Sequence, residues 1–168
     1  TSESSNWQVF HKDLGHATNT SLHAGTALLR LNTTGDRSIG SSDYWNNTLP
    51  TSTHISLGGG GEAHNLTGKT YIAYLFADNS SEDLEDQMIK CGSYTGAYPT
   101  QVAVTLGWEP QFILVRPITQ TSDWNIQDSM RGIVSGGSGK VLDANTINAE
   151  GSANSLKLTA TGFETEGG

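Results

Sequence analysis

The amino-acid sequence predicts an all-β protein, an antiparallel β-sandwich of jelly-roll or concanavalin-like type. Three observations lead to this prediction. Glycine, serine, threonine and asparagine make up about two fifths of the 168 residues, and all four disfavour helices. Many short apolar stretches alternate with a period of two residues, which is typical of half-buried strands. Residues that favour turns separate these stretches, as they do in sandwiches and barrels.

The strand pattern recurs along the chain. The stretches that carry it are rich in aromatic and β-branched residues: 7–10, 71–76, 102–106, 112–115, 124–126 and 156–158. Residues 102–106 and 112–116 are close enough in sequence to form a hairpin. The sequence therefore predicts many short strands joined by tight turns.

One segment near the middle of the chain departs from the strand pattern. Residues 81–89 begin with Ser81, a residue type that caps helices, and acidic residues follow in what would be the first turn. Leu84, Met88 and Ile89 would share one face of this helix. We expect a short helix here, within an acidic connector at residues 79–90.

An internal repeat divides the chain into two related halves, residues 1–78 and 91–168. The matching pairs are WQV at Trp7 with WNI at Trp124, Gly15 with Gly132, LRLN at Leu29 with LDAN at Leu142, and, more loosely, residues 55–57 with 156–158. Several matches in one order indicate a duplication. We therefore predict a single sandwich domain over residues 1–168, built from two related halves and the connector.

The two halves differ in the strands that they contain. The first half runs on into the apolar stretch 71–76, and the second half has no counterpart of that stretch after residues 162–163. A sheet edge left open in this way is rarely bare in proteins. We expect either a continuation of the chain or a neighbouring subunit to cover it, by strand addition or swapping.

Five side chains are predicted to support the core: Trp7, Trp124, Phe76, Phe112 and Arg131. Trp7 and Trp124 occupy equivalent places in the two halves, which predicts one core anchor in each half. Arg131 follows a strand and precedes Gly132, which predicts a turn where Arg131 reaches Asp128 or free carbonyls. The alternative is that Arg131 and Asp128 form a polar pair that binds a ligand.

Tyr44, Trp45 and Trp108 are the candidate ligand-binding residues. All three lie among residues that favour turns, where aromatic rings are often exposed. Exposed rings stack on the apolar faces of sugars or anchor protein interfaces. The alternative is that these rings cap the ends of the core.

Charge and composition exclude several classes of protein. The net charge is −8, and the nine Lys and Arg residues are spread singly, so no basic patch is available for nucleic acid. No apolar run approaches the roughly 18 residues of a membrane span. The single cysteine, Cys91, permits neither an internal disulfide nor a cysteine zinc cluster.

No motif points to catalysis, a metal or a cofactor. His11, His16 and His23 have a loose spacing and lack the HExxH pattern of zinc enzymes, so solvated loop histidines are expected. The acidic run at 78–86 lacks the spaced ligands of a calcium loop. The glycines at 58–61 lack the lysine of a phosphate loop, which favours a flexible hairpin loop. We expect no catalytic residue and no enzyme.

An ordered set of motifs resembles an uncharacterised tandem β-rich domain of large structural proteins in marine and other tailed bacteriophages. The motifs are GSYTG at 92–96, LGWEPQFILVR at 106–116, WNIQDSMRG at 124–132, AE at 149–150, GF at 162–163, WNNTLPTS at 45–52 and NLTGKTYIAYLFA at 65–77. The resemblance extends from about Trp7 to Phe163.

The resemblance implies a non-enzymatic protein of the virion, either a capsid decoration protein or a tail or fibre module. It implies other virion proteins as partners and no known catalysis, and we expect a homo-oligomer. The alternative is a module that binds carbohydrate on the host surface through Tyr44, Trp45 and Trp108.

Overall fold

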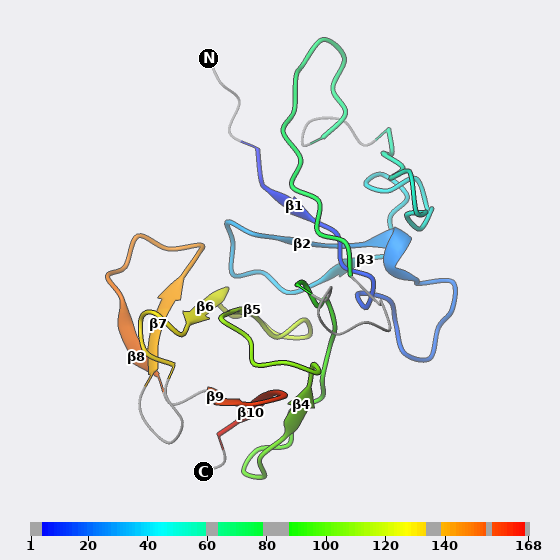
Figure 1. The fold of residues 1–168 in the computed structure, drawn as a ribbon. Helices are drawn as coiled ribbons and strands as arrows, with labels where there is room; N and C mark the ends of the chain where they lie inside the picture. Colours follow the sequence, from blue (N-terminus) through cyan, green and yellow to red (C-terminus); the bar gives the residue numbers. More distant parts are fainter. Residues whose placement is uncertain (1–4, 60–63, 79–87, 134–138, 154–155, 167–168) are drawn as a thin grey trace. The chain divides into compact units, whose positions relative to one another are not determined.

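The protein is all-β, as the sequence predicts. The computed structural model describes residues 5–59, 64–78, 88–133, 139–153 and 156–166. In these ranges ten strands form three antiparallel sheets, and one turn of 3-10 helix accompanies them (Figure 1). Among the same residues, no helix is long and apolar enough for a membrane span. The jelly-roll or concanavalin-like connectivity stays a prediction.

The chain divides into two compact units. Unit 1 comprises Thr1–Leu75 and Pro117–Ser122, and unit 2 comprises Phe76–Arg116 and Asp123–Gly168. Backbone hydrogen bonds attach the short second piece to unit 1. Arg37 donates to the Ile118 carbonyl at 3.2 Å, and Ser122 donates to the Thr34 carbonyl at 3.0 Å.

Unit 1 contains one three-stranded sheet with the order β1-β2-β3. Its elements are β1 (Gln8–Val9), the helical turn η1 (Ala24–Thr26), β2 (Ala27–Arg30) and β3 (Ser38–Ile39). The central strand β2 is an apolar run, and Ala27 and Leu28 are completely buried. His23 caps η1, because its Nδ1 accepts the N–H of Gly25 at 3.0 Å.

Unit 2 contains two sheets. The first has the order β4-β10-β9, with β4 at Ala103–Thr105, β9 at Leu156–Thr159 and β10 at Gly162–Thr165. The second has the order β5-β6-β7-β8, with β5 at Phe112–Val115, β6 at Asn125–Asp128, β7 at Gly139–Asp143 and β8 at Gly151–Ala153.

An apolar cluster fills the space between the two sheets of unit 2. Its buried members are Ile113 of β5, Ile133, Leu156 of β9 and Phe163 of β10, and Val104, Leu106, Val115 and Leu158 pack against them. Because these side chains come from both sheets, the sheets face each other across the cluster, as in a sandwich. The Tyr94 ring lies edge-on to Phe163 with centroids 5.7 Å apart, and burial raises the pKa of Tyr94 above its ordinary value.

Two expected elements differ from the structure, and a third lies mostly outside the described residues. The stretches 102–106 and 112–116 form no hairpin, because β4 pairs with β10 and β5 pairs with β6. The stretch 71–76 is not a strand, since it has no ladder partner among the described residues. Residues 55–57, the loose repeat match of residues 156–158, are not a strand either. The expected helix at 81–89 lies outside the described residues, apart from residues 88 and 89, which are not helical.

The two halves contain hairpins with the same register. The opposed residues are Gln8 with Arg30 and Val9 with Leu29 in β1–β2, and Asn125 with Asp143 and Ile126 with Leu142 in β6–β7. Each residue therefore has its repeat counterpart at the same place in the other hairpin. The pairing continues beyond the strands, because Leu31 donates to Trp7 O and Ala144 donates to Trp124 O, both at 2.9 Å.

An asparagine clamp closes each hairpin at the same point. In unit 2, Asn145 Oδ1 accepts the Trp124 N–H at 2.7 Å, and its Nδ2 donates to Asp123 Oδ1 at 2.7 Å. In unit 1, Asn32 makes the same two bonds, to the Trp7 N–H and to Asn6 Oδ1, each at 3.0 Å. The sequence repeat aligns both asparagines. Only the structure reveals that each one also donates a hydrogen bond to the residue before the tryptophan.

Candidate functional site

The aromatic cluster of unit 1 contains two of the three candidate ligand-binding residues. We define the cluster as Phe10, Tyr44, Trp45 and His64. Trp45 is only 8% exposed, and its Nε1 donates to the carbonyl of Ala27 at 2.8 Å. The Phe10 ring lies edge-on to Trp45 at 5.7 Å. Trp45 is therefore a core residue, and the expectation that it contacts a ligand is wrong.

His64 is the cluster member that the sequence did not indicate. It is 9% exposed, and its ring stacks on Trp45 with centroids 5.8 Å apart. Its Nε2 lies 3.3 Å from the carbonyl oxygen of Asp43, while its buried Nδ1 has no hydrogen-bond partner among the described residues. Nothing in the local sequence separates His64 from the loop histidines, because its burial depends on a loop distant in the chain.

Tyr44 is a partly exposed member of the cluster. Its ring is half-buried, and its centroid lies 6.0 Å from that of His64. The Tyr44 hydroxyl accepts from Arg30 Nη2 at 3.4 Å. An amphipathic ring beside a guanidinium can bind the face and the hydroxyls of a sugar, so Tyr44 remains a candidate contact.

Gly58 holds the Tyr44 loop in place. Its N–H donates to the Tyr44 carbonyl at 2.8 Å, and its own carbonyl accepts from Asn65 Nδ2 at 2.9 Å. A Cβ at this position would overlap the carbonyl oxygen of Asp43. The expected flexible hairpin loop at 58–61 is therefore wrong at Gly58, where two backbone segments cross too closely for a side chain. Gly60 and Gly61 lie outside the described residues.

Trp108, the third candidate, belongs to unit 2. It is half-buried and follows Gly107, whose φ of +98° turns the chain between β4 and β5. Its Nε1 is buried and has no hydrogen-bond partner in the described part of the chain. Pro110 nearby is fully buried. These positions fit the alternative that Trp108 caps one end of the core.

The aromatic residues predicted to lie in the core differ in how far they are buried. Trp124 is 7% exposed, and the guanidinium carbon of Arg116 lies 5.1 Å from its ring centroid. Trp7 is 50% exposed and stacks on Tyr74 instead. Phe76 and Phe112 are also exposed, so the core prediction is wrong for Trp7, Phe76 and Phe112. Phe112 alternates with the buried Ile113 on an edge strand, which turns its ring to the outer face.

Arg131 and Asp128 form the turn that follows β6. Asp128 Oδ1 accepts the backbone N–H of Arg131 at 2.8 Å, and Oδ2 accepts from Arg131 Nε at 2.7 Å. Arg131 Nη1 lies 3.8 Å from a Glu150 oxygen. Gly132 continues the turn with a φ of +100°. The arrangement matches the structural interpretation of Arg131, because the bonds close a turn of the chain.

This turn predicts a dependence of stability on pH. The hydrogen bonds from the Arg131 side chain and backbone hold the pKa of Asp128 below its ordinary value. A lowered pKa stabilises the fold above the pKa of the unfolded chain, and that contribution is lost as the pH falls through the lower pKa of the folded chain. We expect urea midpoints measured from pH 6 to pH 2.5 to fall less for Asp128→Asn than for the wild type. An equal fall in both proteins would contradict this role, and Asp36→Asn, at an exposed aspartate, is the control.

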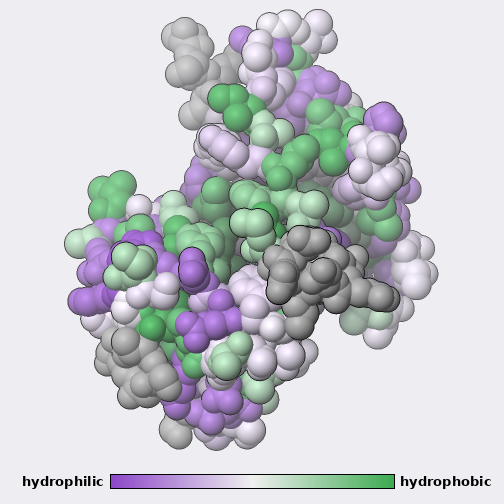
Figure 2. Space-filling model, in the orientation of Figure 1, coloured by the Kyte–Doolittle hydropathy of each residue, from purple (hydrophilic) through white to green (hydrophobic). Residues whose placement is uncertain are grey.

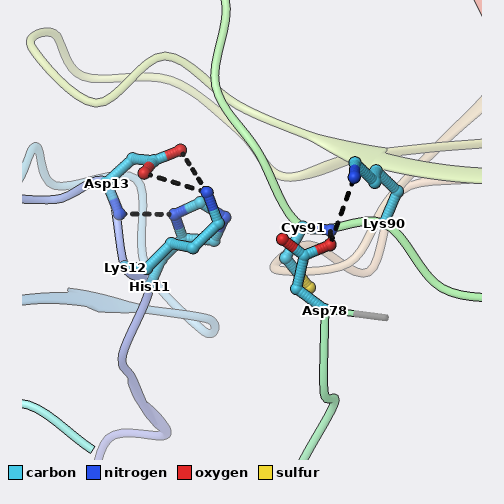
Figure 3. Close-up of polar contacts among 6 residues, drawn as sticks. All are labelled: His11, Lys12, Asp13, Asp78, Lys90 and Cys91. Atoms are coloured by element: carbon cyan, nitrogen blue, oxygen red, sulfur yellow. Dashed lines mark hydrogen bonds and ion pairs between the residues drawn. The ribbon is translucent and has the colours of Figure 1, made fainter. Parts of the chain in front are cut away.

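Histidines of unit 1 close turns. Figure 3 shows His11, whose Nδ1 accepts the N–H of Asp13 at 3.1 Å, and Lys12, whose Nζ lies 3.2 Å from Asp13 Oδ1. His16 accepts the N–H of Thr18 in the same way at 3.3 Å. Over the described residues, no group of three or more His, Cys, Asp or Glu side chains is placed to hold a metal ion.

Asp78 links the two ends of the acidic connector. Its Oδ1 accepts the N–H of Cys91 at 3.2 Å and lies 3.9 Å from Lys90 Nζ (Figure 3). The residues on either side of the connector are therefore in contact. Its acidic residues at 82–86 lie outside the described part.

A family model covers almost the entire chain. It is described as Domain of unknown function (DUF7483) and matches residues 1–167. The chain belongs to the DUF7483 family. No curated protein and no solved structure matches the chain significantly. The DUF7483 match includes both units and both asparagine clamps, so the repeated hairpin lies within the family's domain.

Proposed function

We propose that this DUF7483 chain is a non-enzymatic structural protein of a bacteriophage virion, a capsid decoration protein or a tail or fibre module that acts through assembly. The observation that carries the proposal is the apolar stretch at residues 71–76. Ile72, Tyr74, Leu75 and Phe76 are each 69% to 74% exposed. Soluble proteins rarely leave such stretches bare, and exposed apolar patches mark interaction surfaces. The motif resemblance to phage structural proteins supports the same role.

The way in which polar side chains are used also supports a structural role. Asn32, Asn145, His11 and Asp128 each accept backbone N–H groups, and in doing so hold turns and hairpin ends. Such contacts fix the backbone of a chain that is rich in glycine and short in regular structure. A rigid scaffold of this kind suits a module that must present the same surface in many copies.

Purified particles test the proposal directly. We expect quantitative mass spectrometry of virions from a phage that encodes this chain to find it at a fixed copy number. Immunogold labelling is expected to place it on either the capsid or the tail, which also separates the two forms of the proposal. A chain that is abundant in the lysate and missing from gradient-purified virions would contradict the proposal.

Carbohydrate binding is the second candidate function, and the position of Tyr44 favours it. The half-buried ring lies beside Arg30 and His64, a combination that can stack on a sugar and donate to its hydroxyls. We expect titration with host polysaccharide to change tryptophan fluorescence, and Tyr44→Ala to weaken binding by about tenfold. Tyr98→Ala, at an 82% exposed tyrosine of unit 2, is the matched control. Equal affinities for the two variants would exclude Tyr44 as a contact.

A further inference from the structure

The segment at residues 71–76 is apolar, yet it has no strand partner in the described structure. None of its residues belongs to a sheet, and the two tyrosines, the isoleucine, the leucine and the phenylalanine are all exposed. The segment has the composition of a strand, with aromatic and β-branched residues. No backbone N–H or C=O group of the segment is paired in a ladder with another described residue, so a second strand can pair with these groups.

The segment shares its surface with β1. The Tyr74 ring stacks on Trp7 with centroids 6.1 Å apart and an interplanar angle of 26°, and Trp7 is itself 50% exposed. Figure 1 shows the segment running beside β1, and Figure 2 shows hydrophobic side chains at the surface in the same region. We call Trp7 and residues 71–75, which all belong to unit 1, the assembly surface.

Charge points to the occupant of this surface. Residues 70–77 are all uncharged, whereas Lys69 precedes them and Asp78 follows them. If two copies of the segment run antiparallel about a twofold axis, uncharged residues face uncharged residues. The same arrangement brings the Lys69 end of each copy to the end of the other that carries Asp78, whose Oδ1 also lies 3.9 Å from Lys90 Nζ of its own chain. The segment is therefore complementary to itself, as a twofold interface requires.

The exposed side chains of the assembly surface are large and mostly apolar. Ile72, Tyr74 and Leu75 are each 70% to 74% exposed, and apolar and aromatic side chains of this kind form the centres of protein interfaces. A second strand would add ladder hydrogen bonds to this apolar contact. A net charge of −8 on each copy opposes association at any surface, and an uncharged segment adds no further like-charge repulsion at the contact.

We infer that the assembly surface binds a second copy of this chain, with the two segments antiparallel. The inference rests on the proposed assembly function and names its partner.

Solution mass tests the inference. We expect sedimentation equilibrium of the wild type to give a dimer with a Kd of about 10 μM or tighter. Ile72→Ser combined with Leu75→Ser is expected to weaken association at least 30-fold, since it removes two apolar side chains from each copy. Met130→Ser combined with Ile147→Ser is the matched control, because both residues are exposed apolar side chains of unit 2. The control is expected to associate as the wild type does, and circular dichroism should show the same fold in all three proteins.

Orientation is tested by zero-length carbodiimide cross-linking of a mixture of ¹⁴N- and ¹⁵N-labelled chains. Mixed-isotope cross-links between Lys69 and Asp78 are expected from antiparallel segments. A wild type that is monomeric at about 100 μM, or dimers that the serine variant leaves unchanged, would overturn the inference. A monomeric chain that is still found in purified virions would contradict the dimer and leave the proposed function intact. A dimer that is missing from virions would support the dimer and contradict the proposed function.

Discussion

Alanine in place of Gly162 is expected to lower the free energy of unfolding by about 3 kcal/mol or more, the upper range for overpacking a core. Gly162 lies opposite Thr105 in the β4–β10 pair, and a Cβ there would overlap the backbone carbonyl oxygen of Val104. Backbone cannot move aside as a side chain can. Relief therefore requires β10 to shift, and Phe163, which is buried in the unit 2 cluster, shifts with it.

Urea unfolding followed by circular dichroism measures the total effect of Gly162→Ala, and hydrogen exchange locates it. The amides of Leu106 and Gly107 both donate to the Thr161 carbonyl, so they are expected to lose protection first. Gly96→Ala is the control within unit 2, because a Cβ there would meet no atom within 4 Å. A Gly162 variant as stable as the Gly96 variant would show that β4 and β10 do not approach this closely.

Removal of the unit 2 clamp is expected to have the second largest effect. Asn145→Ala loses two hydrogen bonds of 2.7 Å and leaves the part-buried Trp124 N–H without its acceptor, which should cost about 2 kcal/mol. Asn32→Ala removes the same bonds from the exposed clamp of unit 1, where water can replace them, and should cost about half as much. Urea unfolding of both variants measures the difference.

Substitution of each clamp asparagine by aspartate is expected to separate the two clamps further, because the residues that face the new carboxylate differ. Asn32→Asp keeps an acceptor for the Trp7 N–H and faces the amide of Asn6, which can turn to donate. Asn145→Asp places a second carboxylate against Asp123. We expect Asn32→Asp to be nearly neutral, and Asn145→Asp to be as destabilising as Asn145→Ala at pH 7, with recovery in acid as one carboxyl becomes protonated. Equal effects at the two positions would contradict the assigned contacts.

The residue repeat predicted more of the fold than the hydrophobic alternation did. The runs that begin at Trp7 and Trp124 lie in hairpins of identical register, because cross-strand pairing and the asparagine clamp are local to about 25 residues. The turn at Arg131 was predictable for the same reason, since Asp128 and Gly132 are its near neighbours. Alternation alone predicted a strand at 71–76, which the structure does not contain.

Burial of the tryptophans could not be predicted from their contexts. Trp45 lies in a turn-rich loop and is buried, because its ring packs between Phe10 and His64 and its N–H reaches β2. Trp7 lies at the start of a strand and is half exposed. Its repeat counterpart Trp124 is covered because Arg116 lies over its ring. The difference depends on which distant segment reaches each ring.

The sequence by itself determined the all-β class, the repeat of the segments that begin at the two tryptophans, and the turn at Arg131. Each follows from propensities or contacts between residues close in the chain. Only the tertiary structure decided which apolar stretches pair, that β4 and β5 lie in different sheets, and that His64 joins the aromatic cluster. A strand needs a second strand to pair with, and a buried ring needs other residues packed over it. Both are supplied by segments that are distant in sequence, so no pattern in the nearby residues predicts them.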